Sequence, residues 1–172
     1  MTKALTFRKI ALEDIDELAA IVADAFVDYS AFAPAGWLPP SASEQVDVLQ
    51  RWIADADFWG ELASDGGAIA GHTAFVPAAR HTSQAVPDST LAHLGHLFVR
   101  PQYWGSGTAA QLLKRAMDAA ALEGFVSMRL FVPAGQLRAR AFYGREGFLA
   151  TGEPFDIGLG LPVFEYRCSL ER

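Results

Sequence analysis

The segment from Leu91 to Val132 constrains the fold most, because a strand, a glycine turn, a helix and a second strand follow one another directly. Apolar residues fill positions 91–99, and Gly105 and Gly107 follow. Apolar residues then recur at helical spacing as far as Ala120, and Val126 to Val132 is again strand-like. A strand–helix–strand segment places its strands parallel in one sheet, joined by a right-handed crossover. The segment therefore predicts an α/β domain.

The remaining pattern predicts how this unit is extended on both sides. Further strands are expected at Leu5–Ile10, Phe58–Ala63, Ala68–Val76, Phe148–Thr151 and Val163–Leu170. Further helices are expected at Ile15–Tyr29 and Gln136–Glu146. Another helix should begin at Ser41 or Ser43, with Glu44 as the capping partner. The Asp65-Gly66 pair predicts a hairpin turn. Ala79–Ser89, which contains Pro87, is expected to be an exposed connection. The order is β-α-α-β-β-β-α-β-α-β-β, a mixed and mostly antiparallel sheet flanked by helices in one domain, 1–172.

Composition excludes several classes of protein. The 172 residues are 51% hydrophobic and 20% charged, which favours one globular domain with a sizeable core. A net charge of −6 without a basic face argues against nucleic-acid binding. No apolar run is long enough to span a bilayer, and the N-terminus lacks the apolar core of a signal peptide. The single cysteine, Cys168, cannot form an intramolecular disulfide, so we expect a cytoplasmic protein without a membrane partner.

The glycine turn predicts an anion site. A strand that runs through such a turn into a helix leaves backbone N–H groups convergent at the positive end of the helix dipole, which suits a pyrophosphate. A pair of glycines alone could equally be a structural turn that caps a helix. No Gly-Lys-Ser/Thr follows Gly107, which excludes a Walker loop, and the third glycine of a dinucleotide fingerprint is missing.

Two ordered motifs make the turn more specific. Gln102-x-x-Gly105-x-Gly107 resembles the Gln/Arg-x-x-Gly-x-Gly/Ala signature of the GCN5-related N-acetyltransferase (GNAT) superfamily. Gln136-x-x-Ala139-x-x-Phe142-Tyr143, followed by Gly147-Phe148, is similar to the superfamily's Asn-x-x-Ala-x-x-Phe-Tyr and Gly-Phe pattern. The resemblance covers roughly Leu91 to Gly152. It implies a small-molecule N-acetyltransferase with acetyl-CoA as co-substrate and no metal.

The resemblance also implies residues that bind the cofactor. These are Leu97, Phe98, Val99, Gln102, Trp104, Gly105, Ser106, Gly107, Thr108, Ala109, Gln136, Ala139 and Phe142. The turn amides would hold the pyrophosphate, and the end of the preceding strand would pair with the pantetheine as another strand would. Gln136 departs from the superfamily's asparagine and offers the same amide on a longer stem.

Two catalytic roles follow from the same resemblance. Tyr143 matches a tyrosine that protonates the leaving thiolate, although it could also be an ordinary core tyrosine. His93 falls where some relatives carry a catalytic glutamate, and His96 or ordered water are alternatives as the base. Three residues apart on a strand, the two histidines are expected to point to opposite faces, so we expect no metal site between them.

The first helix and the loop after it are expected to cover the acceptor. Asp28, Tyr29, Phe32 and Trp37 combine a carboxylate with aromatic rings, which suits an ammonium group. A protein or peptide amine, or a non-catalytic acyl-CoA-binding regulatory domain, remain alternatives to a small amine. The superfamily also suggests a homodimer.

Overall fold

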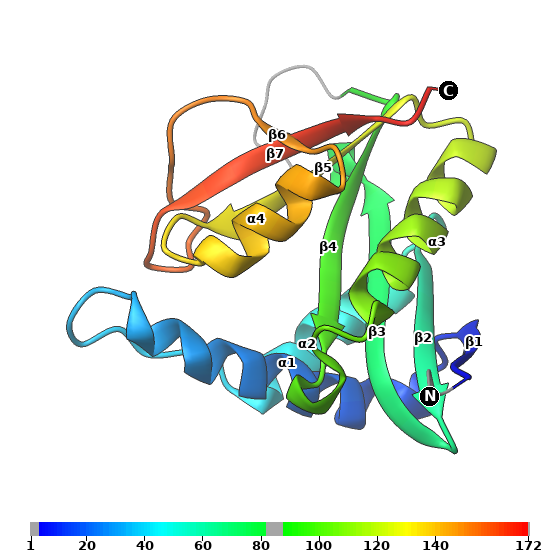
Figure 1. Ribbon diagram of the computed structural model, residues 1–172, viewed down its shortest axis with the longest axis horizontal. Coiled ribbons are helices and arrows are strands. Elements are labelled where there is room, and N and C mark those ends of the chain that lie inside the picture. Colours follow the sequence, from blue (N-terminus) through cyan, green and yellow to red (C-terminus); the bar gives the residue numbers. More distant parts are fainter. Residues whose placement is uncertain (1–3, 82–87, 172) are drawn as a thin grey trace.

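The computed structural model describes residues 4–81 and 88–171 as one seven-stranded sheet between two layers of helices (Figure 1). The strands are β1 (Thr6–Lys9), β2 (Trp59–Asp65), β3 (Ala68–Pro77), β4 (Leu91–Val99), β5 (Ser127–Pro133), β6 (Leu149–Ala150) and β7 (Val163–Ser169), in the spatial order β1-β2-β3-β4-β5-β7-β6. The helices are α1 (Ile15–Val27), α2 (Ala42–Ile53), α3 (Thr108–Leu122) and α4 (Leu137–Arg145). Short 3₁₀ turns are η1 (Leu12–Asp14), η2 (Asp28–Ala31), η3 (Ala78–His81) and η4 (Pro101–Tyr103).

The predicted order of elements is confirmed, as is the mixed sheet. The Ser41 hydroxyl accepts a hydrogen bond from the Glu44 amide, and the Glu44 carboxylate accepts one from the Ser41 amide, which is the expected capping box of α2. The expected helix to Tyr29 ends earlier, since α1 stops at Val27 and Tyr29 lies in η2. Pro87, in the expected connection, lies outside the described residues.

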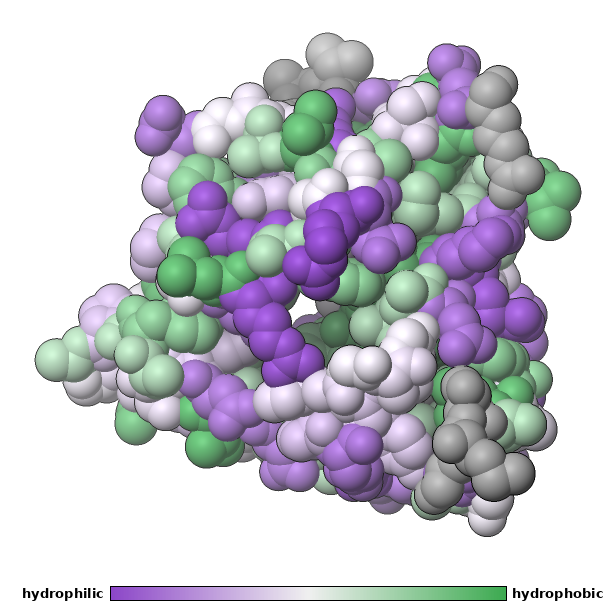
Figure 2. Space-filling view, viewed as in Figure 1, coloured by the Kyte–Doolittle hydropathy of each residue, from purple (hydrophilic) through white to green (hydrophobic). Residues whose placement is uncertain are grey.

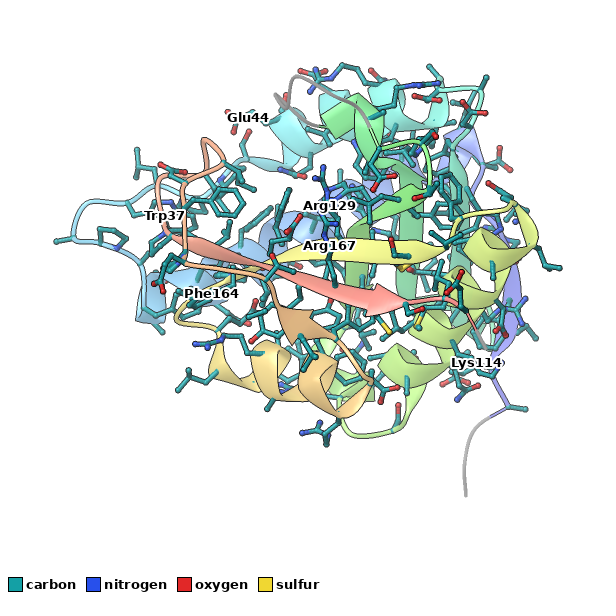
Figure 3. The ribbon with its side chains drawn as sticks, turned by 90° about the horizontal axis from the view of Figure 1, so that it is seen from above. Trp37, Glu44, Lys114, Arg129, Phe164 and Arg167 are labelled. Carbon is teal, nitrogen blue, oxygen red and sulfur yellow. The ribbon has the colours of Figure 1, made fainter. Side chains whose placement is uncertain are left out.

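Helices cover both faces of the sheet, and each face has its own core. On one face α1 and α2 pack over Leu18, Leu49 and Leu62, none of which is exposed to solvent. On the other face α3 and α4 cover a larger cluster that includes Phe75 and Phe148. The views in Figures 1 and 3 show the two layers on either side of the strands. In the described part of the chain, no helix is long and apolar enough to cross a membrane.

The parallel pairing of β4 and β5 is short. It consists of Leu91 with Ser127, Ala92 with Met128, and His93 with Arg129. Beyond these pairs β4 continues to Val99 and β5 to Pro133 without pairing to each other. The two strands therefore diverge in the middle of the sheet (Figure 1).

A bulge in β4 changes which way its histidines point. Ala74 of β3 pairs with His96, whereas Phe75 pairs with Leu94, so Gly95 is an extra residue. A Cβ at Gly95 would lie 1.9 Å from the Trp52 ring, so the bulge accepts only glycine while α2 packs this closely.

The bulge overturns one expectation from the sequence. The rings of His93 and His96 lie 6.1 and 5.1 Å from the ring of Trp52, so both point toward α2 and not to opposite faces. The extra residue breaks the two-residue period on which that expectation was based. Within residues 4–81 and 88–171, no three His, Cys, Asp or Glu side chains gather as a metal site would require.

A buried carboxylate joins the end of β1 to the turn that precedes α1. Asp14 is 6% exposed, and its two oxygens accept from Arg8 Nη1 and Nη2 at 2.7 Å each. The Arg8 hydrogen bond lowers the pKa of Asp14, and the Ala11 amide adds to the effect. Asp14→Asn should therefore cost roughly 2 kcal/mol of unfolding free energy at neutral pH. Urea unfolding checks this value.

The pH dependence gives the control for this variant. Because the folded-state pKa is lowered, the wild type gains its stability above the unfolded pKa of about 3.9 and loses it as the pH falls through the folded value. The two proteins should become equally stable in acid. A difference that stays constant with pH would contradict the ion-pair explanation.

Candidate active site

A cavity of about 650 Å³ lies where β4 and β5 diverge. Its walls come from both strands, from the end of α1 and η2, from the glycine turn before α3, and from α4. Figure 2 shows a hollow near the middle of this face, with apolar surface inside and hydrophilic residues along its rim. The gap left by the missing strand pairing thus opens into a cavity of the size that small-molecule sites have.

The glycine turn forms the anion-binding end of the cavity. Gly105 and Gly107 have φ values of 76° and 85°, a conformation that side chains rarely adopt. A Cβ at Gly105 would meet nothing within 4 Å, so space for a ligand lies in front of the turn. Gly107 is also the N-cap of α3, where the first N–H groups of a helix lack intrahelical partners. The turn therefore has the geometry that a phosphate group requires.

Trp104 and two arginines line this end of the cavity. The Trp104 indole Nε1 donates to the Val99 carbonyl at 2.8 Å, which fixes the ring on the end of β4. The Arg138 guanidinium lies 3.9 Å from the centre of the same ring. Arg145, two turns further along α4, lines the same cavity. The residues at this end fit an anionic group such as the pyrophosphate of CoA.

Most of the predicted cofactor residues line this cavity. They are Leu97, Phe98, Val99, Trp104, Gly105, Gly107, Ala109, Gln136, Ala139 and Phe142. Gln102, Ser106 and Thr108 are outside the lining, and the Thr108 side chain is buried beneath the turn. Here the Ser106 and Thr108 hydroxyls, 2.7 Å apart, hold the turn in shape.

Sequence reasoning missed several lining residues. Leu130, Phe131 and Val132 follow one another on β5, and all three line the cavity. The divergence leaves one edge of β5 unpaired, and side chains from both faces of the strand lie beside that edge, so a two-residue period cannot identify them. Arg145 and Glu146 continue the α4 face that begins at Arg138, and helical spacing from the second motif could have found them.

Two tyrosines, Tyr29 and Tyr143, line the cavity. Burial raises the pKa of Tyr143, and the neighbouring Tyr29 raises it further. Burial also raises the pKa of Tyr29 to about 12, although a hydrogen bond from the Gln136 side chain opposes the shift. Both phenols are therefore protonated at neutral pH. The amide of Gln136, on its longer side chain, thus has Tyr29 as its hydrogen-bond partner, and Tyr29 belongs to the wall that α1 and η2 form.

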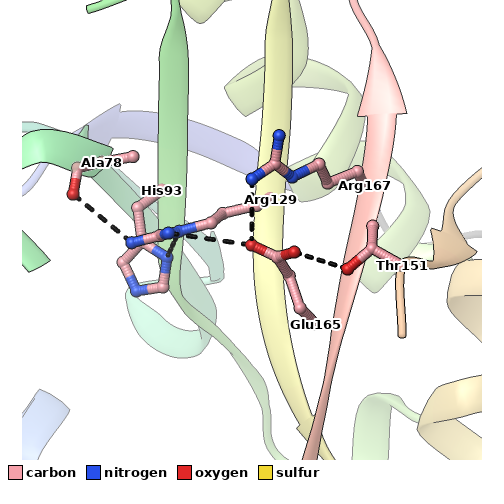
Figure 4. A network of polar contacts seen from close by, with 6 residues as sticks. All are labelled: Ala78, His93, Arg129, Thr151, Glu165 and Arg167. Carbon is pink, nitrogen blue, oxygen red and sulfur yellow. Dashed lines mark hydrogen bonds and ion pairs between the residues drawn. The ribbon is translucent and has the colours of Figure 1, made fainter. Parts of the chain in front are cut away.

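His93 lies outside the cavity, in a polar network behind Phe131. It is 6% exposed, and its ring centre is 5.0 Å from that of Phe131. Arg129 Nε donates to His93 Nδ1 at 3.4 Å, and Arg129 Nη1 lies 3.7 Å from Glu165 (Figure 4). His96 is also buried, and its Nδ1 lies 3.4 Å from Nε2 of His72. The structure does not bring His93 together with Tyr143 around the open space.

Three of the four predicted acceptor residues line the cavity. Asp28, Tyr29 and Phe32 do so, whereas Trp37 packs behind them. The Trp37 indole donates to the Leu159 carbonyl at 2.7 Å and joins the loop after α1 to the loop before β7 (Figure 3). Trp37 therefore supports this wall and does not form its inner surface.

Known proteins share this arrangement. Residues 22–148 match the model of the acetyltransferase (GNAT) family. An uncharacterized N-acetyltransferase of Mycobacterium tuberculosis is 29% identical over 149 residues, which are 82% of this chain and 86% of that protein.

Solved structures agree in fold. The PaiA N-acetyltransferase of Thermoplasma acidophilum in complex with coenzyme A superposes with a TM-score of 0.73 at 18% identity, over 96% of this chain and 99% of that one. An N-acetyltransferase of Staphylococcus aureus gives a TM-score of 0.75 at 17% identity, over 98% and 99%. With the family model covering most of the sequence, this chain belongs to the acetyltransferase (GNAT) family and is an acyltransferase.

Proposed function

We propose that the protein transfers an acetyl group from acetyl-CoA directly to the primary amine of a small molecule while both substrates are bound. The observation that carries this proposal is one cavity that joins a phosphate-binding glycine turn to two protonated tyrosines through the gap between β4 and β5. Acetyl-CoA supplies the acetyl group as a thioester. The reaction then forms a carbon–nitrogen bond, breaks a carbon–sulfur bond and moves one proton from nitrogen to sulfur.

The chain offers a matching group at each end of the cofactor. The amides at Gly105 and Gly107, with Arg138 and Arg145, would hold the phosphates. The unpaired edge of β4 from Leu97 to Val99 would pair with the pantetheine arm. A backbone N–H on this edge would stabilise the charge that develops on the thioester oxygen.

Tyr143 is the proposed general acid. Its Oη carries a proton at neutral pH, because burial raises the pKa of the phenol. It would donate that proton to the sulfur as the carbon–sulfur bond breaks. The phenolate left behind is a stronger base than the thiolate, whose thiol has an ordinary pKa of about 8.5, and it would regain a proton from solvent.

The amine must lose a proton before it attacks. We keep His93 as a candidate base that would act at a distance through water, since its ring lies behind Phe131. Positioning of a neutral amine next to the thioester also lowers the barrier without a base. If His93 accepts the proton through water, His93→Gln should change the pH dependence of turnover. If positioning alone is sufficient, the pH dependence should stay the same.

Thermal melting in the presence of acetyl-CoA, CoA, ATP and NAD tests the proposed function. A ligand that binds only the native state raises the melting temperature, and the rise grows with the logarithm of the ligand concentration above its dissociation constant. We expect a rise with acetyl-CoA and CoA, and none with ATP or NAD. No rise with either CoA form at saturating concentration would contradict the proposal.

A variant of Gln136 tests how the two substrate sites are connected. Gln136→Asn shortens the amide by one methylene group and should break the hydrogen bond to Tyr29. We expect acceptor turnover to fall roughly tenfold, as loss of one hydrogen bond worth about 1.4 kcal/mol predicts. The release of free thiol from acetyl-CoA measures turnover, and the rise in melting temperature with acetyl-CoA measures cofactor affinity.

The matched control removes the same hydrogen bond from the other side. Tyr29→Phe should have a similar effect, and the double variant should be no worse than either single variant, because both remove one interaction. Fully additive losses would show that Gln136 and Tyr29 act independently.

A further inference from the structure

The half of the cavity next to α1 is an aromatic pocket with a single charge. We call it the acceptor pocket and define it by the lining residues on this side of the β4–β5 gap: Ala25, Asp28, Tyr29, Phe32, Gly95, Phe98 and Phe131. Four of these seven carry aromatic rings, and Asp28 is the charged one. Gly95 contributes bare backbone, because the edge of Trp52 occupies the place of a side chain.

The rings of this pocket are held in place. Tyr29 is 7% exposed, with Phe26 at 5.0 Å and Phe32 at 5.3 Å between ring centres. Its phenol also has a hydrogen bond with the Gln136 side chain. Phe32 packs against backbone, since a Cβ at Gly135 would lie 2.6 Å from the Cβ of Phe32. A ring that enters the pocket therefore meets preformed apolar walls and not flexible side chains.

A second layer supports the walls from outside. Trp37 stacks on Tyr29 at 6.3 Å and donates to the Leu159 carbonyl. One carboxylate oxygen of Asp156 accepts from the amides of Gly158, Leu159 and Gly160 at 2.8, 3.0 and 3.2 Å, which folds this loop into a tight turn. Phe155 from the same loop meets Phe131 edge-on at 5.5 Å.

The charges divide the cavity into two ends. Asp28 is exposed at the edge of the acceptor pocket, where it can attract one ammonium group. The arginines that line the cavity, Arg138 and Arg145, lie on α4 at the phosphate end, and Glu146 is the one carboxylate beside them in the described lining. An acceptor with several ammonium groups would leave charges unpaired among the aromatic rings. An acceptor carboxylate would meet no positively charged residue among the described lining residues of this pocket.

We propose that the acceptor is an arylalkylamine, a primary monoamine with an aromatic ring and no carboxylate. Its ring packs among Phe32, Phe98 and Phe131, and Asp28 draws its ammonium form to the pocket edge. The amine loses its proton to water on entry and attacks in the neutral form, as the reaction above requires. This inference rests on the proposed acetyl transfer and narrows its acceptor.

The test measures release of free thiol from acetyl-CoA with four probes. Phenethylamine is the expected substrate, L-phenylalanine adds only a carboxylate, n-hexylamine removes only the ring, and spermidine adds charges. We expect kcat/KM for phenethylamine to exceed that for L-phenylalanine and spermidine at least about 100-fold. Each of these two probes would place an extra charge without a partner among the aromatic rings, which costs more free energy than the loss of an apolar contact. The ratio to n-hexylamine should be roughly tenfold.

A pair of phenylalanine variants locates the effect. Phe131→Leu should lower kcat/KM for phenethylamine more than that for n-hexylamine, so that the ratio of the two falls roughly tenfold, since only phenethylamine loses a ring-to-ring contact. Phe164→Leu on the neighbouring strand β7 is the control, because Phe164 lies outside the cavity lining under Arg140. Equal effects of the two substitutions would overturn the pocket assignment.

The outcomes separate this inference from the proposed function. If acetyl-CoA raises the melting temperature but spermidine or L-phenylalanine is the better acceptor, the arylalkylamine inference is overturned and acetyl transfer stands. Failure of phenethylamine to release thiol also overturns the inference. If acetyl-CoA does not stabilise the protein, the proposed function itself fails.

Discussion

Gly107→Trp should abolish the stabilisation of the protein by acetyl-CoA. Gly107 has a φ of 85° and caps α3, and a Cβ there would have Gln111 Nε2 as its nearest neighbour at 4.0 Å. An indole would fill this open space, where the phosphates are proposed to lie, and would separate them from the turn amides. The difference in melting temperature with and without acetyl-CoA measures the loss.

The other end of the same helix provides the control. Gly124 follows α3, has a φ of 94°, and also has open space around it. Tryptophan at either position adopts an unfavourable backbone conformation that costs roughly 1–2 kcal/mol. Gly124→Trp should therefore lower the stability as much as Gly107→Trp but keep the response to acetyl-CoA. An unchanged response in Gly107→Trp would refute the pyrophosphate site.

Tyr143→Phe should lower turnover by roughly 100-fold or more while acetyl-CoA affinity stays within about twofold. The substitution removes only the hydroxyl, and the ring keeps its packing against Phe148 at 5.8 Å. Because burial raises the pKa of this phenol, its loss removes a proton donor that is available throughout the neutral range. Initial rates of thiol release, with acetyl-CoA saturating, measure the effect.

Tyr166→Phe is the matched control for this prediction. Tyr166 is 7% exposed and accepts from Arg140 Nε at 3.1 Å, but it is outside the cavity lining. Its loss should reduce stability without changing turnover at a temperature where the variant is folded. Similar rates for Tyr143→Phe and the wild type would remove the acid role from Tyr143.

The sequence was most informative where structure depends on neighbouring residues. The strand, turn and helix from Leu91 to Leu122 follow from apolar periodicity and from two glycines that local conformation requires. The α2 capping box follows from Ser41 and Glu44 alone. Most of the predicted cofactor residues also line the cavity, since the two motifs lie on elements that meet at the diverging strands.

The sequence was least informative where distant segments meet. Gly95 is the extra residue of the bulge in β4, and it turns His93 and His96 toward the same face of the sheet. This bulge depends on the close contact of Gly95 with Trp52 of α2, a residue far away in the sequence. The hydrogen bond between Tyr29 and Gln136 joins two ends of the chain that no local pattern relates. The barrier between His93 and the cavity is Phe131, a neighbour from another strand. Each of these facts depends on packing that propensity does not encode.

The three residue pairs between β4 and β5 have a consequence for motion. They are the entire parallel ladder that joins β1–β4 to β5–β7 in the described sheet, so the two halves are linked across it by few backbone hydrogen bonds. Amide protons along the diverging edges should exchange quickly with deuterium in the free protein and slowly once a pantetheine arm fills the gap. The gap between β4 and β5 would then be filled only while the pantetheine arm is bound.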